Sequence, residues 1–250
     1  MAPHITFEEF NKKIEPLPVY FDYEKPVLTT YFFNSVDGLI YELLELKALP
    51  GTEYSGCIEI KCCIFNDMAQ DSATYVAEDI LEQSNDPFLA AQEALNVGLD
   101  IEDKEFAAIY LFKDFVISNN GSDVVGKQIK AARISTEYAE FGVTKKIYSY
   151  IAKKYNILVC DNTQTPNGHS LWAYGISRWG DLKIYNVATQ KFVGIFSRED
   201  EDPGLKPWSV PFNYPMQDEN KFRKNVCEIT DLTYHHLVLV VIASEVNCDI

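Results

Sequence analysis

The sequence contains no long apolar run, no metal-binding motif and no internal repeat. No stretch of about 18 or more consecutive apolar residues occurs, so a membrane-spanning helix is not expected. Neither a CxxC pair nor an HExxH pattern is present, so no metal site is predicted. Residues 1–20 include Glu8, Glu9 and Glu15 and lack a continuous apolar segment, which argues against a signal peptide.

The sequence contains six cysteines, enough for three disulfides. Cys62 and Cys63 are adjacent and the sequence carries no export signal, so we expect free thiols in a reducing cytoplasm rather than disulfides. With 47% hydrophobic and 13% aromatic residues, the chain is long enough to bury a substantial core. No low-complexity linker divides it, so one domain over residues 1–250 is predicted. Its three portions are residues 1–105, 106–197 and 198–250.

Basic residues are scarce in the first part of the chain. Residues 1–110 hold 21 Asp and Glu but 6 Lys and Arg, a net charge of −15, whereas residues 111–250 hold 16 of each. An acidic portion of this kind repels phosphates, so binding to a nucleic-acid backbone is not expected. It suits a basic protein partner, mimicry of nucleic acid, or solubility alone. Residues 127–154 have a local net charge of +5, which fits either a phosphate-bearing ligand or a solvated helix face.

The N-terminal portion shows alternating signals for helices and strands. We expect a helix over residues 6–14 with Thr6 as N-cap, a strand over 57–65 and a helix over 72–83. Asp86 and Pro87 predict the N-cap and first residue of a further helix that ends near Gly98. Residues 39–49 fit either a helix or a buried strand.

The central portion predicts a hairpin, a helix and a strand in succession. Residues 106–118 and 124–135 flank a turn rich in Asn, Gly and Asp, which is typical of a β-hairpin. An apolar residue recurs every four positions over 143–155, which indicates an amphipathic helix that begins near Gly142. Residues 157–160 then form a strand parallel to the one before the helix.

The C-terminal part predicts a second hairpin, over 181–187 and 192–196, and a buried strand over 237–243. Residues 198–223 are rich in proline. They form either a surface excursion or a packed connection that is pinned by aromatic side chains such as Trp208.

A family resemblance lies between Gln128 and Trp172, in the segment QIKAARISTEYAEFGVTKKIYSYIAKKYNILVCDNTQTPNGHSLW. Its order of strand, glycine turn, amphipathic helix, strand and short helix resembles the central part of the GNAT-type N-acetyltransferases. The second half, ILVCDNTQTPNGHSLW, is most similar to GNAT-like proteins that bacteriophages encode. The resemblance implies an α+β fold with a mixed, mostly antiparallel central sheet flanked by helices, here with an elaborated N-terminal portion.

In this family, backbone N–H groups of the turn before the helix bind the pyrophosphate of acetyl-CoA. The turn pattern is Arg/Gln-x-x-Gly-x-Gly/Ala, and the aligned residues here are Ala139, Gly142 and Thr144, of which Gly142 fits. Gly142 therefore either approaches a phosphate or only shapes a tight turn. The resemblance implies the following acetyl-CoA contacts: Ile134, Gly142, Val143, Thr144, Lys145 and, on the pantetheine arm, Asn162. It also implies that Tyr174 is the acid for the leaving thiolate, although a tyrosine at this place also suits packing.

Three functional hypotheses follow. The protein is an acyltransferase that uses acyl-CoA, a catalytically inactive GNAT-fold protein that inhibits or binds a basic host factor through its acidic portion, or a virion-associated structural protein. No metal or membrane is involved in any of them. If a phage encodes the chain, its expected location is the host cytoplasm. The sequence predicts neither the acceptor substrate nor the oligomeric state.

Overall fold

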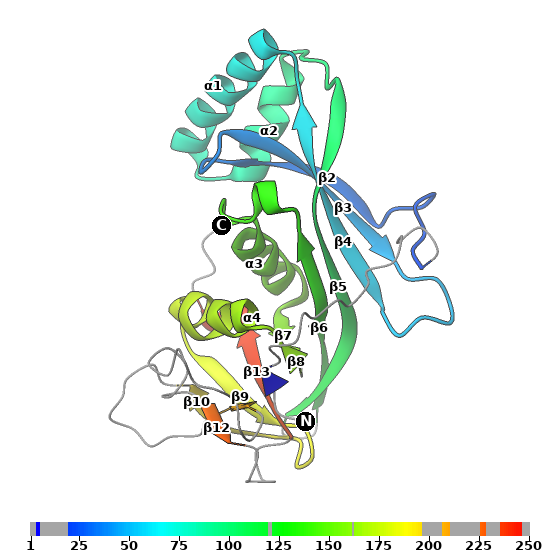
Figure 1. Cartoon of the computed structure of the whole chain (residues 1–250), viewed down its shortest axis with the longest axis vertical. Coiled ribbons are helices and arrows are strands. Elements are labelled where there is room, and N and C mark those ends of the chain that lie inside the picture. The colour runs from blue at the N-terminus through cyan, green and yellow to red at the C-terminus, as the bar shows by residue number, and fades with distance from the viewer. Residues whose placement is uncertain are drawn as a thin grey trace. The chain divides into compact units, whose positions relative to one another are not determined.

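Nine strands form the main sheet of the protein. The computed structural model describes residues 4–5, 20–119, 122–161, 163–196, 207–210, 226–228 and 236–246. Within them the strand order is β10-β9-β13-β7-β6-β5-β4-β3-β2, and four helices accompany this open sheet (Figure 1). Strands β6 and β7 run parallel, whereas the outer pairs on both sides are antiparallel. The predicted α+β class with a mixed, mostly antiparallel sheet is confirmed.

By its internal contacts the chain divides into two compact units. The first contains Met1–Lys13, Asp114–Lys130 and Tyr148–Asp249, and the second contains Ile14–Lys113, Ala131–Ile147 and Ile250. Two strands and one helix run through both units, so the division does not decide the number of domains. The single domain stays a prediction.

The second unit begins with an antiparallel meander. Its strands are β2 (Leu28–Asn34), β3 (Leu39–Lys47) and β4 (Gly56–Ile64), and β5 (Asp103–Asn119) pairs with the other edge of β4. The ambiguous residues 39–49 thus form a strand for most of their length. Strand β3 is paired on both edges and largely buried, which accounts for its mostly apolar sequence. The strand predicted over 57–65 is confirmed.

Two helices cover part of one face of this meander. They are α1 (Asp67–Ser84) and α2 (Pro87–Asn96). The Asp86 side chain accepts hydrogen bonds from two N–H groups of the first turn of α2, so the predicted cap is confirmed. Helix α1 begins five residues before the predicted position because Asn66 caps it there. Alanine side chains of both helices are buried against Phe33 and Ile40, and their small size lets the helices approach the sheet closely.

The predicted strand, helix and parallel strand around Gly142 are confirmed. They are β6 (Ser122–Ile134), α3 (Val143–Tyr155) and β7 (Ile157–Val159). Lys127 and Gln128 of β6 align with Leu158 and Val159 of β7 in parallel register. A helix is the usual connection between neighbouring parallel strands, because the chain must return to the end of the sheet at which the first strand began.

The first unit ends in antiparallel strands, as predicted. Strands β9 (Leu182–Asn186) and β10 (Lys191–Phe196) form a hairpin, and β13 (Leu237–Ile242) lies between β9 and β7. Strand β13 is buried over most of its length, which agrees with its continuous apolar sequence.

Four short segments form a separate parallel sheet in the first unit. Its strands are β12 (Val226–Glu228), β11 (Trp208–Val210), β1 (His4–Ile5) and β8 (Thr163–Gln164). Trp208 is fully buried, so the connection is packed at this residue rather than open to solvent. Most of the proline-rich stretch and the helix predicted over 6–14 lie outside the described residues.

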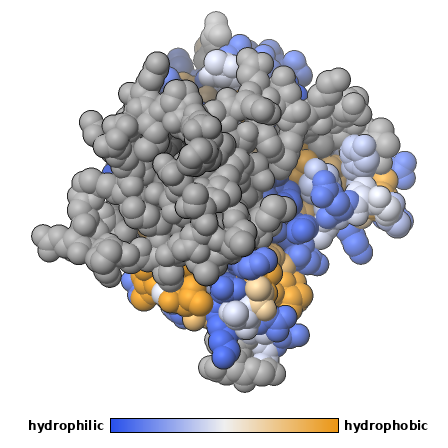
Figure 2. Space-filling model, turned by 60° about the horizontal axis from the view of Figure 1, so that its bottom comes forward, coloured by the Kyte–Doolittle hydropathy of each residue, from blue (hydrophilic) through white to orange (hydrophobic). Residues whose placement is uncertain are grey.

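Several apolar side chains of the first unit reach the surface. They lie on the β5–β6 and β9–β10 hairpins and include Val116, Val124, Val125, Val193 and Ile195. Figure 2 shows apolar areas beside hydrophilic ones on the described surface of one face. No helix among the described residues is long and apolar enough to cross a bilayer.

Candidate functional site

The segment between β6 and α3 turns sharply at Gly142. Its φ is +74°, in the left-handed region that favours glycine, and a Cβ placed there meets no atom within 4 Å. The Gly142 carbonyl accepts hydrogen bonds from the N–H groups of Lys145 and Lys146, at 3.0 and 3.4 Å. In an α-helix each N–H group donates to the carbonyl four residues earlier. For Val143 and Thr144 those carbonyls precede α3, so the helix itself does not satisfy their N–H groups. Such N–H groups, at the positive end of the helix dipole, suit an anion.

Thr144, which departs from the family pattern, is turned into the protein. Its Oγ1 lies 3.0 Å from the hydroxyl oxygen of Tyr110, a fully buried residue of β5. Burial raises the pKa of the Tyr110 hydroxyl, so this pair stays neutral. The β-branched side chain is thereby held on the sheet side of the helix.

Two lysines flank the turn. Lys145 is exposed, while Lys146 is partly buried, and burial lowers the pKa of Lys146 even though Asp37 acts in the opposite direction. Asp37 belongs to the β2–β3 turn, and its carboxylate accepts a hydrogen bond of 2.6 Å from the Tyr41 hydroxyl. The turn thus has positive charge on its helix and one fixed carboxylate nearby.

The remaining predicted acetyl-CoA contacts are distributed as follows. Ile134 is the last residue of β6 and is half-buried, and Val143 is buried in the core with its N–H in the first turn of α3. Residues 134 and 142–145 therefore all belong to the second unit. Asn162 lies outside the described residues.

Tyr174, the predicted acid, belongs to the first unit and is 39% exposed. It follows α4 (Pro166–Ser170), in a π-helical turn that spans Leu171–Gly175. π-Helical turns are rare in proteins, and those that occur often lie at functional sites. The ring of His169 packs edge-on against two aromatic rings. The distance between ring centroids is 6.1 Å to Tyr174 and 4.5 Å to Trp208.

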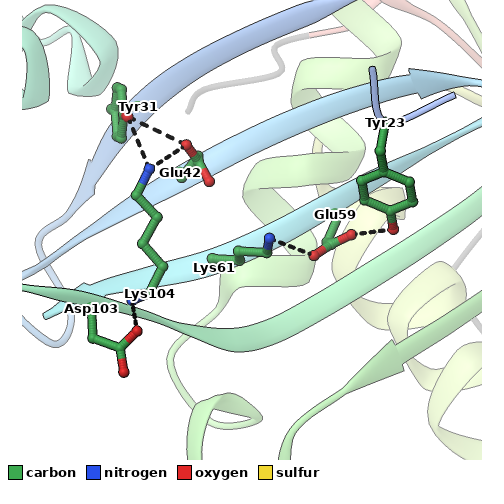
Figure 3. Close-up of polar contacts among 7 residues, drawn as sticks. All are labelled: Tyr23, Tyr31, Glu42, Glu59, Lys61, Asp103 and Lys104. Carbon is green, nitrogen blue, oxygen red and sulfur yellow. Dashed lines mark hydrogen bonds and ion pairs between the residues drawn. The ribbon is translucent and has the colours of Figure 1, made fainter. Parts of the chain in front are cut away.

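Two clusters that were not predicted lie in the second unit, each with a tyrosine, a glutamate and a lysine (Figure 3). In the first, Glu42 accepts hydrogen bonds from the Tyr31 hydroxyl at 3.3 Å and from Lys104 Nζ at 2.6 Å. The hydrogen bonds to Glu42 and Tyr31 outweigh the effect of burial and raise the pKa of Lys104. Sequence spacing gives no sign of this cluster, because Lys104 lies 62 residues from Glu42.

The second cluster joins Glu59 to Tyr23 and Lys61. The Tyr23 hydroxyl donates to Glu59 Oε2, and Lys61 Nζ lies 3.1 Å from Glu59 Oε1. Burial, together with this carboxylate, raises the pKa of Tyr23. Both glutamates are less than 10% exposed and have their partners within the cluster, so the arrangement is structural.

The cysteines whose side chains the structure describes offer no nucleophile at neutral pH. Cys57, Cys62, Cys63 and Cys160 are all free and buried. Burial raises the pKa of Cys62 to about 11 and that of Cys160 to about 12, so both remain protonated. No group of three or more His, Cys, Asp or Glu side chains in the described part of the chain is placed to hold a metal ion.

The glycine turn at the start of α3 is therefore the candidate site, and its groups suit a phosphate-bearing ligand. Comparisons of this chain with protein-family models, with curated proteins and with solved structures find no match.

Proposed function

We propose that the protein is an acyltransferase that binds acyl-CoA, such as acetyl-CoA, at the turn between β6 and α3. The observation that carries this proposal is the turn itself. Gly142 has a positive φ and open surroundings, and it is followed by a helix whose first N–H groups need acceptors from outside the helix. A pyrophosphate supplies such acceptors, and Lys145 adds positive charge beside them.

The order of elements around the turn supports the same assignment. A strand leads to the glycine, a helix follows, and the next strand runs parallel to the first, as the resemblance to the GNAT-type N-acetyltransferases implies. The departure at Thr144 is compatible with a ligand, because its hydroxyl is bonded inward to Tyr110 and does not fill the turn.

Bound acyl-CoA would supply a thioester whose acyl group passes to an amine. In this proposal the N–H groups of residues 142–144 hold the pyrophosphate, and Ile134, at the end of β6 in the same unit, contacts the cofactor. The resemblance to the GNAT-type N-acetyltransferases implies that Tyr174, in the first unit, gives a proton to the thiolate as the C–S bond breaks. The amine loses one proton as the C–N bond forms, so the transfer has no net change in protons. Tyr174 is partly exposed and lies in a π-helical turn.

Calorimetric titration with acetyl-CoA tests the proposal, with Gly142→Ala and Gly98→Ala as a matched pair. Gly98 also has a positive φ (+84°) and no atom within 4 Å of an added Cβ, but it follows α2. Each alanine should cost about 1 kcal/mol of stability through backbone strain. We expect G142A to weaken acetyl-CoA binding about tenfold or more, because its methyl group and strain disturb the phosphate-binding N–H groups. G98A should bind as the wild type does. Absence of binding by the wild-type protein, or equal binding by both variants, would contradict the proposal.

A second candidate function is an inactive GNAT-fold protein that meets a basic host factor. The observation that favours it is the stretch from Lys61 to Lys104, which contains ten acidic residues and no lysine or arginine between those two. Helices α1 and α2 occupy most of this stretch, and eight of its acidic side chains are exposed. A wild-type protein that fails to bind acetyl-CoA would leave this candidate as the stronger one.

A further inference from the structure

Asn34 connects the first strands of the second unit to the candidate turn. It is the last residue of β2 and is fully buried. Its Nδ2 donates a hydrogen bond of 3.1 Å to the carbonyl oxygen of Phe141, a residue 107 positions away in the sequence. Phe141 directly precedes Gly142. The side chain of Asn34 therefore fixes the peptide group at which the turn begins.

This bond also sets the direction of the Gly142 N–H group. In a trans peptide the carbonyl of one residue and the N–H of the next point to opposite sides. The peptide between Phe141 and Gly142 is trans, since no cis bond occurs in the described structure. Because the Phe141 carbonyl faces the buried Asn34, the Gly142 N–H points away from the interior. Gly142 itself is exposed, so this N–H is directed towards solvent.

The other polar atom of Asn34 adds a cost in stability. Oδ1 is buried and has no hydrogen-bond partner among the residues that the structure describes. The amide cannot be reversed to relieve this, because the nitrogen must face the Phe141 carbonyl. An unpaired buried acceptor destabilises the folded state, and an apolar side chain of similar shape would avoid that penalty. An asparagine that lowers stability indicates a role other than packing.

We propose that Asn34 is a positioning residue for acyl-CoA, and that it keeps the Phe141 carbonyl turned inward and the Gly142 N–H turned outward. This assignment rests on the proposed function of the turn. Without the Asn34 bond, the peptide can rotate and present its carbonyl oxygen to the pyrophosphate. Two negative groups then face each other, and one of the N–H donors is lost.

The β2–β3 turn provides a matched control. The Asn34 carbonyl accepts a hydrogen bond from the Gly38 N–H at 2.9 Å, and the Gly38 carbonyl accepts one from Thr74 Oγ1 at 2.8 Å. Thr74→Val removes a side-chain to main-chain hydrogen bond from this same turn, as a substitution of Asn34 does. It leaves the Phe141 carbonyl and its bond to Asn34 in place.

The test compares wild type, N34L and T74V by acetyl-CoA calorimetry and by thermal unfolding without ligand. For N34L we expect acetyl-CoA affinity to fall about tenfold while the unfolding midpoint stays equal or rises, because leucine removes the unpaired acceptor and the freed Phe141 carbonyl can turn to solvent. For T74V we expect a lower midpoint and unchanged affinity. If N34L does not fold, N34A, which leaves room for water, is measured in its place with the same expected loss of affinity.

Each other outcome overturns the assignment. If the wild type binds acetyl-CoA and N34L binds it equally well, Asn34 has no positioning role although the proposed function stands. If N34L loses stability and affinity together, as an ordinary structural residue would, the assignment is also wrong. If the wild type binds neither acetyl-CoA nor inorganic pyrophosphate, the proposed function fails and the role of Asn34 fails with it.

Discussion

In the second unit, tyrosine hydroxyls donate hydrogen bonds to carboxylates, which basic side chains usually do. Four tyrosines donate hydrogen bonds to carboxylates there, in the pairs Tyr23–Glu59, Tyr31–Glu42, Tyr41–Asp37 and Tyr138–Glu105. Residues 1–110 contain 21 acidic and 6 basic residues, so cations are too few to pair with every carboxylate. A buried carboxylate needs donors, and a hydroxyl on an apolar ring supplies one without adding charge.

His169 shows how burial of a titratable residue makes stability depend on pH. It is fully buried against aromatic rings, and burial lowers the pKa of its imidazole to about 4. The unfolded chain takes up the proton near pH 6.5, before the folded protein does. We therefore expect stability to fall as the pH drops from about 6.5 to 4, by up to about 3 kcal/mol, and no further contribution below that range.

Thermal or urea unfolding between pH 4 and 7 checks this prediction. His169→Phe keeps a ring against Trp208 but removes the titrating group, so its unfolding free energy should vary less with pH than that of the wild type. His236 is exposed, and substituting it provides the control because burial is the cause of the effect. An H169F profile as steep as the wild-type profile would show that other groups cause the loss.

Local signals predicted the elements of this fold well. The helix after Gly142 and the cap at Asp86 depend on residues close in sequence, and both were found where the pattern placed them. Residues 39–49 were ambiguous, because a strand buried on both faces has the same continuous apolar composition as a buried helix. Pairing with β2 and β4 decides this case, and pairing is not a local property.

Only the local part of the candidate site could be predicted from the sequence. Gly142 could be predicted because it lies in a turn between a strand and a helix. Asn34 does not, because its contact with Phe141 spans 107 residues and follows from the fold of the β2–β3 meander. The inward position of Thr144 likewise depends on Tyr110, which lies 34 residues away on β5.

The parallel pair β6–β7 requires a glycine at position 126. A Cβ added to Gly126 would lie 2.4 Å from Ile157 Cγ2 and 2.8 Å from the Ile157 carbonyl oxygen, too close for real contacts. We expect Gly126→Ala to destabilise the protein by about 1–3 kcal/mol, because the backbone of β7 would have to shift. Urea unfolding measures this change.

Gly168→Ala, in helix α4, is the control. A Cβ at Gly168 meets its nearest atoms at 3.5 Å, an ordinary contact, and its φ is not positive. This variant should therefore unfold close to the wild-type midpoint. Equal stability of G126A and wild type would mean that the two strands are separated more widely than described.

At the scale of the whole molecule, the negative charge is concentrated in the first 110 residues. The formal net charge of −15 resides entirely in residues 1–110, where α1 carries the exposed carboxylates of Asp71, Glu78, Asp79 and Glu82. An excess of one sign over a surface attracts an oppositely charged partner and speeds its association. It also keeps a protein soluble, and a test must separate these effects.

We expect neutralisation of Glu78, Asp79 and Glu82 on α1 to slow association with a basic partner. The variant E78Q/D79N/E82Q removes three exposed carboxylates from one helix, whereas E24Q/E53Q/D181N removes three exposed ones from separate places. Both sets change the net charge from −15 to −12, so they differ in location alone.

A synthetic lysine-rich peptide is the probe, and association rates are measured over a salt series. The helix variant should associate several-fold more slowly at low salt and approach the wild type as the Debye length shortens to about 8 Å at physiological ionic strength. Equal rates for the two variants would show that net charge, and not a surface on α1, governs the encounter.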